Sequence, residues 1–225
     1  NTYKFTVDLE AKKFSIPLGI YRSGVDNKGS FTVNIAVDTD TVSTLIAVGK
    51  LSNVELLPVD KYTVDQTVAV TDGKDFANAN LVVDLDFLKM NAPGKRYALG
   101  ISISSDQRGV NPKLSTVVVV IDTKIMIPTA NFTYKVDPDD WKKIIFTNIS
   151  SYAVSSSWDF GDESYSTENS PSHVYSGEGI YPVKLTIKGV AGDESTKTVD
   201  VPVLQIAKID KLTWTIVDFS SEEPA

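Results

Sequence analysis

A WDFGD run that begins at Trp158 constrains the fold of this chain more than any other feature. Trp158 and Phe160 stand two positions apart, so in a strand they point to one face and can anchor a core. Asp159 and Asp162 flank Gly161 in a predicted tight turn, where short carboxylates accept hydrogen bonds from backbone amides. The run therefore predicts a small β-sandwich in which these residues have structural roles.

The rest of the C-terminal part also predicts strands. Tyr175 and Tyr181 bracket a loop at residues 176–179, and we expect the two rings to pin it by packing. Strands are expected at residues 130–134, 143–147, 156–160, 180–187 and 196–203. This spacing over about 75 residues suits a compact sandwich.

Alternation of apolar and polar residues dominates the N-terminal part as well. Strands are expected at residues 3–9, 31–37, 81–87, 97–103 and 115–127. Residues 117–121 are continuously apolar, which predicts a strand buried on both faces. One short helix is expected at residues 41–51. About seven strands with frequent turns favour an immunoglobulin-like sandwich, so the predicted fold class is all-β, with two such sandwiches in tandem.

The domain boundary is predicted at Pro128, which lacks a backbone donor and restricts the residue before it, so that the preceding strand should end there. Charge supports this division. Residues 1–127 hold 14 basic and 14 acidic residues, whereas residues 128–225 hold 8 and 15. We expect domains at residues 1–127 and 128–204, followed by a C-terminal strand or tail at residues 205–225.

Composition excludes several classes of function. The chain has 225 residues and no cysteine, which rules out disulfide frameworks and cysteine-based metal sites or nucleophiles. The net charge of −7 comes without a cluster of basic residues, which argues against nucleic acid and anionic lipid surfaces as partners. No apolar run reaches the roughly 18 residues that span a bilayer. Direct membrane insertion is therefore not expected, although a lipid anchor upstream is compatible with the sequence.

Residues 130–204 resemble the PKD domain, an immunoglobulin-like module of cell surfaces. The resemblance rests on the WDFGD run, the PSHVY motif at residues 171–175 and the GIYPV motif at residues 179–183. One departure is Glu163, where the family usually has glycine after the second aspartate. Because that glycine normally serves a positive φ, we expect a different backbone conformation in this turn.

Residues 1–125 resemble the DUF1735-type N-terminal domain of Bacteroides-group surface proteins. The motifs that carry this resemblance are YRSG at residues 21–24, LLPVDKYTV at residues 56–64 and YALGISI at residues 97–103. The resemblance implies a secreted lipoprotein on the extracellular face of the bacterial outer membrane. In that family the domain precedes glycan-binding or glycan-cleaving modules.

The C-terminal stretch at residues 212–225 resembles the opening strand of a discoidin-type (F5/8 type C) domain. If this is its origin, the chain is a fragment of a larger protein. The alternative is an extra strand on the PKD unit, followed by a frayed acidic tail.

Catalysis has little support in the sequence. His173 is the only histidine, and its place in the PSHVY motif explains it structurally. No nucleophile-elbow pattern Gly-x-Ser-x-Gly is present. Two acidic clusters lie in predicted turns, where solvated carboxylates are poor acid–base catalysts. They are Asp137, Asp139 and Asp140, and Asp159, Asp162 and Glu163.

Ligand sites stay open at this point. Calcium is the better functional hypothesis for Asp137, Asp139 and Asp140, although the spaced EF-hand pattern is missing. Trp141 and Trp214 are candidates for exposed rings that stack on sugars, whereas Trp158 is expected in the core. Two N-glycosylation patterns begin at Asn131 and Asn148, and in a bacterial protein they would be incidental.

These observations predict a non-catalytic, monomeric surface protein that acts as a spacer and interaction module in glycan capture or adhesion. No cofactor, metal or catalytic residue is assigned, and a polysaccharide or cell-surface glycan is the expected partner. Two alternatives remain. One is a direct carbohydrate-binding protein, which a row of exposed aromatic residues on one sheet would favour. The other is the accessory N-terminal region of a glycoside hydrolase.

Overall fold

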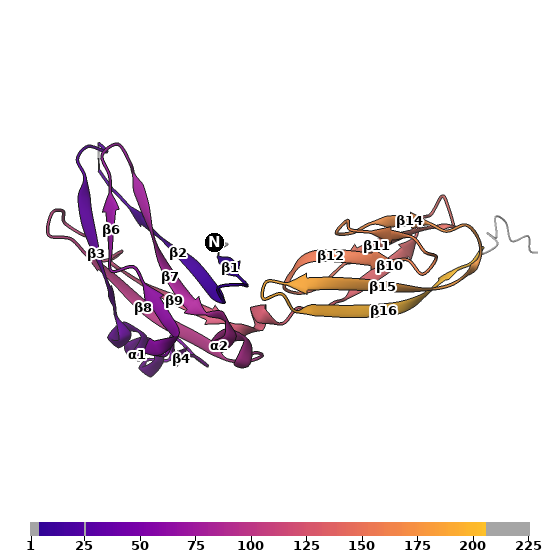
Figure 1. Cartoon of the computed structure of the whole chain (residues 1–225), viewed down its shortest axis with the longest axis horizontal. Coiled ribbons are helices and arrows are strands. Elements are labelled where there is room, and N and C mark those ends of the chain that lie inside the picture. The colour runs from indigo at the N-terminus through magenta and orange to yellow at the C-terminus, as the bar shows by residue number, and fades with distance from the viewer. Residues whose placement is uncertain (1–4, 25, 206–225) are drawn as a thin grey trace, which may run out of the picture.

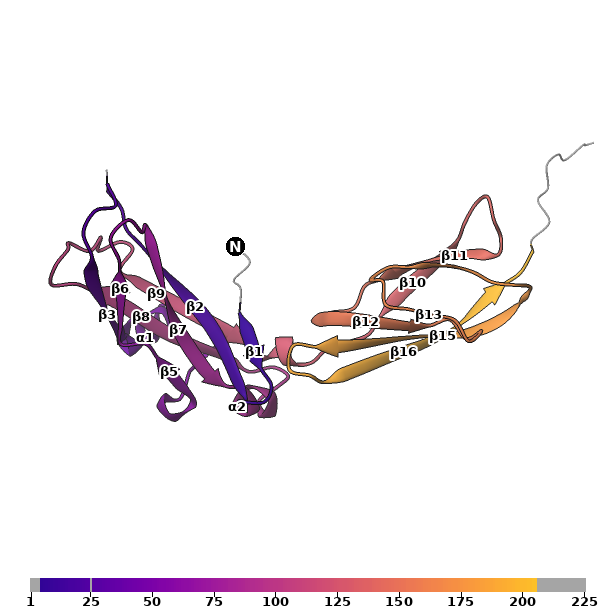
Figure 2. The ribbon, with the colours of Figure 1, turned by 45° about the horizontal axis from the view of Figure 1, so that its top comes forward.

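The computed structural model describes residues 5–24 and 26–205. Within these ranges the chain forms two elongated units built of β-sheets, and the short segment after β9 joins them (Figures 1 and 2). The predicted all-β fold class is confirmed. No helix in the described ranges is long and apolar enough to cross a membrane.

Two facing sheets make up the first unit. One has the strand order β1-β2-β7-β5, and the other has the order β4-β8-β3-β6, with β9 paired to β8. The strands are β1 (Thr6–Asp8), β2 (Lys13–Tyr21), β3 (Phe31–Val37), β4 (Glu55–Leu56), β5 (Tyr62–Val64), β6 (Thr67–Val70), β7 (Phe76–Asp84), β8 (Arg96–Ser104) and β9 (Thr116–Asp122). Short 3₁₀ turns occur at Val59–Lys61 and Thr123–Met126.

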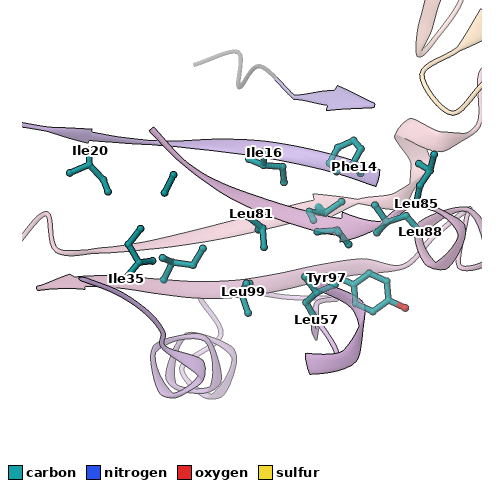
Figure 3. Close-up of a cluster of buried hydrophobic side chains, with 14 of the residues drawn as sticks. Phe14, Ile16, Ile20, Ile35, Leu57, Leu81, Leu85, Leu88, Tyr97 and Leu99 are labelled. Carbon is teal, nitrogen blue, oxygen red and sulfur yellow. The ribbon is translucent and has the colours of Figure 1, made fainter. Parts of the chain in front are cut away.

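The core of this unit lies between the sheets (Figure 3). Alternate residues of β2, such as Phe14, Ile16 and Ile20, face it, and Leu81 of β7 and Leu99 of β8 meet them from the neighbouring strands. All five side chains are buried. Burial of each side chain of this size contributes about 1.5–3 kcal/mol, which makes the alternating pattern the main determinant of strand register.

Helix α1 (Thr39–Ala47) confirms the helix expected at residues 41–51, with an earlier start and end. Asp38 caps it, because its Oδ1 accepts a hydrogen bond from the backbone amide of Thr41 at 3.0 Å. The hydroxyl of Thr41 also donates to Oδ2 of Asp38, at 2.7 Å. The hydroxyl and amide bonds from Thr41 hold the pKa of the Asp38 carboxyl below its usual value. Val42, a residue of this helix, is fully buried.

Two expectations for the first unit are wrong. The strand expected at residues 81–87 ends at Asp84, which caps helix α2 (Leu85–Met90) by accepting a hydrogen bond from the amide of Phe87. Leu85 and Leu88, three residues apart, then both enter the core. A helical turn buries this pair, whereas a continued strand would place them on opposite faces.

The segment at residues 115–127 also differs from expectation. Its strand, β9, ends at Asp122, where a 3₁₀ turn begins, and does not continue to Pro128. The hydroxyl of Thr123 is buried there and donates to the carbonyl oxygens of Lys95 and Asn91. In the described sheet β9 pairs only with β8, so it is an edge strand, and Val117 is 44% exposed. The expected burial on both faces is therefore wrong.

The second unit is a sandwich of two smaller sheets with the orders β10-β11-β14 and β13-β12-β15-β16. Its strands are β10 (Phe132–Val136), β11 (Lys143–Asn148), β12 (Ala153–Asp159), β13 (Tyr165–Ser166), β14 (Ser172–Val174), β15 (Gly179–Gly189) and β16 (Glu194–Val203). Every strand expected in this unit is present, with shifts of a few residues at its ends.

Trp158 is the centre of the second core. It is fully buried, and its ring lies 5.0 Å from that of Phe132 and 5.4 Å from that of Phe146 between centroids. The indole Nε1 donates to the carbonyl oxygen of Glu168 at 3.0 Å, so its polar atom is satisfied. Phe160 is also buried on this face. The predicted anchoring role of Trp158 and Phe160 is confirmed.

The turn after Phe160 keeps a positive φ at the position of the missing glycine. Glu163 has φ 68°, so the different backbone conformation expected here is wrong. Amides of the turn donate to the aspartates as predicted: Gly161 N lies 3.0 Å from Asp159 Oδ1, and Ser164 N lies 3.2 Å from Asp162 Oδ1. These bonds hold the turn geometry although Glu163 must adopt the left-handed region.

Glu163→Gly should therefore stabilise the protein. The left-handed conformation costs a non-glycine residue about 1–2 kcal/mol, and glycine's greater freedom in the unfolded chain offsets part of this gain. We expect a net rise of about 0.5–1 kcal/mol in the free energy of unfolding, measured by urea titration. Glu163→Ala, which keeps the Cβ, is the control and should bring no such rise. If Glu163→Gly is no more stable than Glu163→Ala, the positive φ at this position does not strain the backbone.

Candidate functional site

His173, the single histidine of the chain, lies in hydrogen-bond contact with Asp162. Nε2 of His173, in β14, lies 2.7 Å from Oδ2 of Asp162, in the turn after β12. The histidine ring stacks on Phe160 with centroids 4.3 Å apart and planes at 2°, and it meets the edge of Tyr175 at 4.6 Å. Less than a fifth of each side chain of the pair is exposed.

The pair holds two segments of the second unit together. Burial works to raise the pKa of the Asp162 carboxyl, but the hydrogen bonds from His173 and Ser164 outweigh it and leave that pKa below its usual value. An aspartate with a lowered pKa stays ionised near neutral pH and cannot serve as a general acid there. The geometry therefore agrees with the structural role assigned to His173 from its motif.

Tyr175 and Tyr181 pin the intervening loop, as predicted. Their rings lie 4.1 Å apart between centroids, and the Tyr181 hydroxyl donates to the carbonyl oxygen of Gly177 at 3.1 Å. The hydroxyl of Tyr175 donates to the carbonyl oxygen of Phe160 at 3.1 Å. Burial raises the pKa of the Tyr175 phenol, so this hydroxyl remains a hydrogen-bond donor.

The acidic turn at residues 137–140 does not gather its carboxylates. Oδ1 of Asp137 accepts the amide of Asp139 at 3.0 Å, and its Oδ2 lies 3.0 Å from Nζ of Lys143. These contacts lower the pKa of Asp137. Asp140 accepts the amide of Lys142 instead. Across residues 5–24 and 26–205, no three His, Cys, Asp or Glu side chains are placed to hold a metal ion. The calcium hypothesis gains no support from this geometry.

The tryptophans and asparagines singled out above divide into three groups. Trp141 is half-buried against the core of the second unit, with Nζ of Lys142 5.3 Å from its ring centroid, so it is no open stacking surface. Trp214 lies outside the described residues, as does the stretch resembling a discoidin domain. The Asn131 and Asn148 side chains accept hydrogen bonds from the amides of Phe132 and Ser150.

A contact between the two units is one feature that the sequence did not reveal. The tip of the β15–β16 hairpin, residues 190–193, reaches the first unit, and Ala191 is 4% exposed and belongs to its hydrophobic core (Figure 1). Val190 packs against the same core. The predicted boundary at 127/128 falls between Met126 of the first core and Ala130 of the second.

Polar contacts surround this hairpin tip. Nζ of Lys89, in α2, lies 2.8 Å from Oδ2 of Asp193 and donates to the carbonyl oxygen of Ala191 at 3.3 Å. Such a half-exposed ion pair contributes at most about 1 kcal/mol, so the burial of the apolar tip matters more. Within the second unit, the Oγ of Ser195 accepts the amide of Ala130 at 3.0 Å and so ties the end of the linker to β16. The linker and the hairpin therefore connect the units at two separate points.

A second feature missed by sequence reasoning is an exposed aromatic pair. Tyr21, at the end of β2, and Phe76, at the start of β7, are 77% and 53% exposed and are direct cross-strand partners. Their ring centroids lie 6.1 Å apart. Pairing between strands 55 residues apart in the sequence is not visible in any local pattern, although the exposure of Tyr21 fits the alternation of β2.

Asp162→Asn tests the histidine pair through its pH dependence. A carboxyl whose pKa is lowered by folding stabilises the protein above the usual aspartate value of about 3.9, and this stabilisation is lost as pH falls through the lowered value. We expect the variant to lose about 1–3 kcal/mol of unfolding free energy at pH 7, with the difference shrinking below about pH 4. Urea titrations at several pH values measure it.

The matched control for this experiment is Asp200→Asn, on the exposed part of β16. It should change the free energy of unfolding by less than about 0.5 kcal/mol. If the unfolding free energy of Asp162→Asn stays below that of the unmodified protein by a constant amount down to about pH 2, the ionised carboxylate has no such role.

Comparison with known proteins identifies both units. Residues 1–110 match a family model described as an N-terminal domain, and residues 128–203 match the model of the PKD domain. Collagenase ColA of Bacillus cereus is 46% identical over 52 residues, which make up 23% of this chain and 5% of the collagenase. Collagenase ColQ1 of the same species is 50% identical over 50 residues, again 5% of its length.

Among solved structures, the PKD1 domain of the Vibrio cholerae metalloprotease PrtV is 35% identical, with a TM-score of 0.31; the alignment covers 34% of this chain and 95% of that domain. A putative carbohydrate binding protein from Bacteroides ovatus is 15% identical, with a TM-score of 0.44, and the alignment covers 90% of this chain and 58% of that protein. The chain thus carries a PKD domain at residues 128–203, preceded by a DUF1735-like N-terminal domain at residues 1–110.

Proposed function

We propose that this chain is a non-catalytic spacer of a bacterial surface protein, and that its two domains hold a binding module at a fixed distance and direction. The observation that carries the proposal is the insertion of Ala191, from the PKD domain, into the core of the first domain. A spacer transmits position only if its joints resist bending. Two domains joined by one flexible linker would not do so.

Three contacts support a stiff joint. Ala191 is buried, Lys89 pairs with Asp193, and Pro128 packs closely enough on Gly189 that a Cβ at Gly189 would lie 2.9 Å from the proline ring. The domains meet end to end at an angle, with the hairpin tip and the linker at the bend (Figure 2). The contacts of the hairpin tip and the restricted linker act together against bending.

The setting we propose is the extracellular face of the outer membrane of a Bacteroides-type bacterium, with the chain part of a monomeric lipoprotein used in glycan capture or adhesion. Support comes from the two matched families, which are of accessory or binding type. The structural roles found for His173, Asp162 and the acidic turn also favour a scaffold over an active centre. A polysaccharide or cell-surface glycan is the proposed partner.

Spin-label distances test the stiffness of the joint directly. The absence of cysteine allows Lys50→Cys and Lys197→Cys, at exposed positions of the two domains, to be labelled specifically. We expect one narrow distance distribution for this pair. Adding Ala191→Asp should broaden it, because a buried unpaired carboxylate expels the hairpin tip from the first core. Double electron–electron resonance provides the measurement.

Ala69→Asp is the control, since Ala69 is an exposed residue of β6, in the first domain and outside the hairpin tip. It should leave the distribution narrow. A distribution that is already as broad before Ala191→Asp is introduced would mean that the joint is a hinge, and the spacer proposal would fail.

A further inference from the structure

We infer that Tyr21 and Phe76 form a stacking site for a sugar ring of an uncharged polysaccharide on the outer face of the first domain. We call this site the aromatic platform and include Gly19 and Asn78, which pair with each other across β2 and β7. The inference rests on the proposed glycan partner and gives it a place on the first domain, but it does not depend on the stiffness of the joint.

Gly19 leaves room for the tyrosine ring close to the backbone of its own strand. A Cβ built at Gly19 would lie 2.9 Å from Cε2 of Tyr21 and 3.3 Å from its hydroxyl oxygen, so the ring reaches back over the glycine while most of it stays in solvent. Most of Tyr21 and half of Phe76 remain exposed. Large rings are ordinarily buried because each holds a large apolar area, so an exposed pair suits a ligand that covers it.

The same Gly-Ile-Tyr tripeptide occurs at residues 19–21 and, in the PKD domain, at residues 179–181. In the PKD domain its tyrosine packs inside the domain. Tyr181 lies over Gly179 in the same way, with a Cβ at Gly179 coming within 3.1 Å of its ring. There the ring packs on Tyr175 and on the core of that domain. In the first domain the ring of Tyr21 meets only the exposed ring of Phe76 among the described aromatic residues. One local geometry thus gives a core contact in one domain and an open surface in the other.

The polar groups beside the rings suit an uncharged polyhydroxylated ligand. The outward-facing residues of the paired segments are exposed and carry no charge: Pro17, Gly19, Tyr21, Phe76, Asn78 and Asn80. The Asn80 amide donates to Asp65, whereas Asn78 makes no side-chain hydrogen bond to any described residue. A pyranose has an apolar face of C–H groups and a rim of hydroxyls, which correspond to the rings and to the Asn78 amide.

The strand ends that carry the rings are held in place before any ligand binds. Arg22, next to Tyr21, donates to the carbonyl oxygens of Lys28 and Gly29 at 2.8 and 2.6 Å, and its amide donates to Asp75, next to Phe76, at 2.7 Å. Asp72 accepts the amide of Gly29 at 2.5 Å. Rings on a fixed base lose little freedom on binding, which favours affinity. Strand β2 also runs away from the hairpin tip, so the PKD domain leaves this end open (Figure 1).

Affinity electrophoresis of the whole chain in gels containing single polysaccharides tests the platform. The probes are four neutral polysaccharides (xyloglucan, mixed-linkage β-glucan, galactomannan and pullulan) and one acidic polysaccharide, polygalacturonate. We expect at least one neutral probe to retard the protein. Tyr21→Ala and Phe76→Ala should each weaken that retardation by about tenfold or more, which is the loss of about 1.4 kcal/mol of binding.

Two further variants refine the test. Gly19→Ala keeps both rings but displaces that of Tyr21, and should reduce retardation without lowering the melting temperature. Tyr165→Ala removes a 70% exposed ring from the PKD domain and should leave binding unchanged. The inference is overturned if no neutral probe retards the protein, if only polygalacturonate does, or if Tyr165→Ala loses as much binding as Tyr21→Ala. Because the spacer proposal is tested by spin-label distances, the two can fail separately.

Discussion

Insertion of the β15–β16 hairpin tip into the first domain is the contact on which the relation between the two domains depends. Ala191 is small and belongs to the hydrophobic core of the first domain, and its burial removes apolar surface from water without adding a polar group. The charged neighbours Lys89 and Asp193 remain half-exposed beside it, where they fix the direction of approach more than they add stability. The linker at Pro128 supplies the second point of attachment.

The PKD domain shows how this hairpin can extend so far without losing its shape. β15 and β16 pair over ten residue positions, from Gly179 with Val203 to Lys188 with Glu194. Trp158, opposite Leu185 near the middle of β15, fills the core, and the contact of His173 with Asp162 ties β14 to the turn after β12. The polar groups that might suggest catalysis are thus used to hold loops. Any ligand recognition would fall to exposed surfaces such as the aromatic platform.

Local sequence patterns were sufficient to predict the PKD core. They gave wrong predictions where a cap or a hydrogen bond from a neighbouring residue decided the backbone conformation. Trp158, Tyr175 and Tyr181 were placed correctly, because alternation and turn chemistry act over a few residues. The strand expected to run through Leu85 stopped early, since Asp84 is a helix cap and Leu85 and Leu88 have helical spacing. Glu163 kept the φ of a glycine because surrounding hydrogen bonds hold the turn. The roles of Ala191 and of the pair Tyr21 and Phe76 depend on long-range pairing, which no local pattern encodes.

Backbone ¹⁵N relaxation of the chain tests the central claim most directly, because it reports how each domain tumbles in solution. If the hairpin tip locks the domains together, amides of β8 and of β15 will fit one common anisotropic diffusion tensor with its long axis along the molecule. Two separate tensors, each with the shorter correlation time of a single domain, would contradict a rigid spacer and would make the junction a hinge.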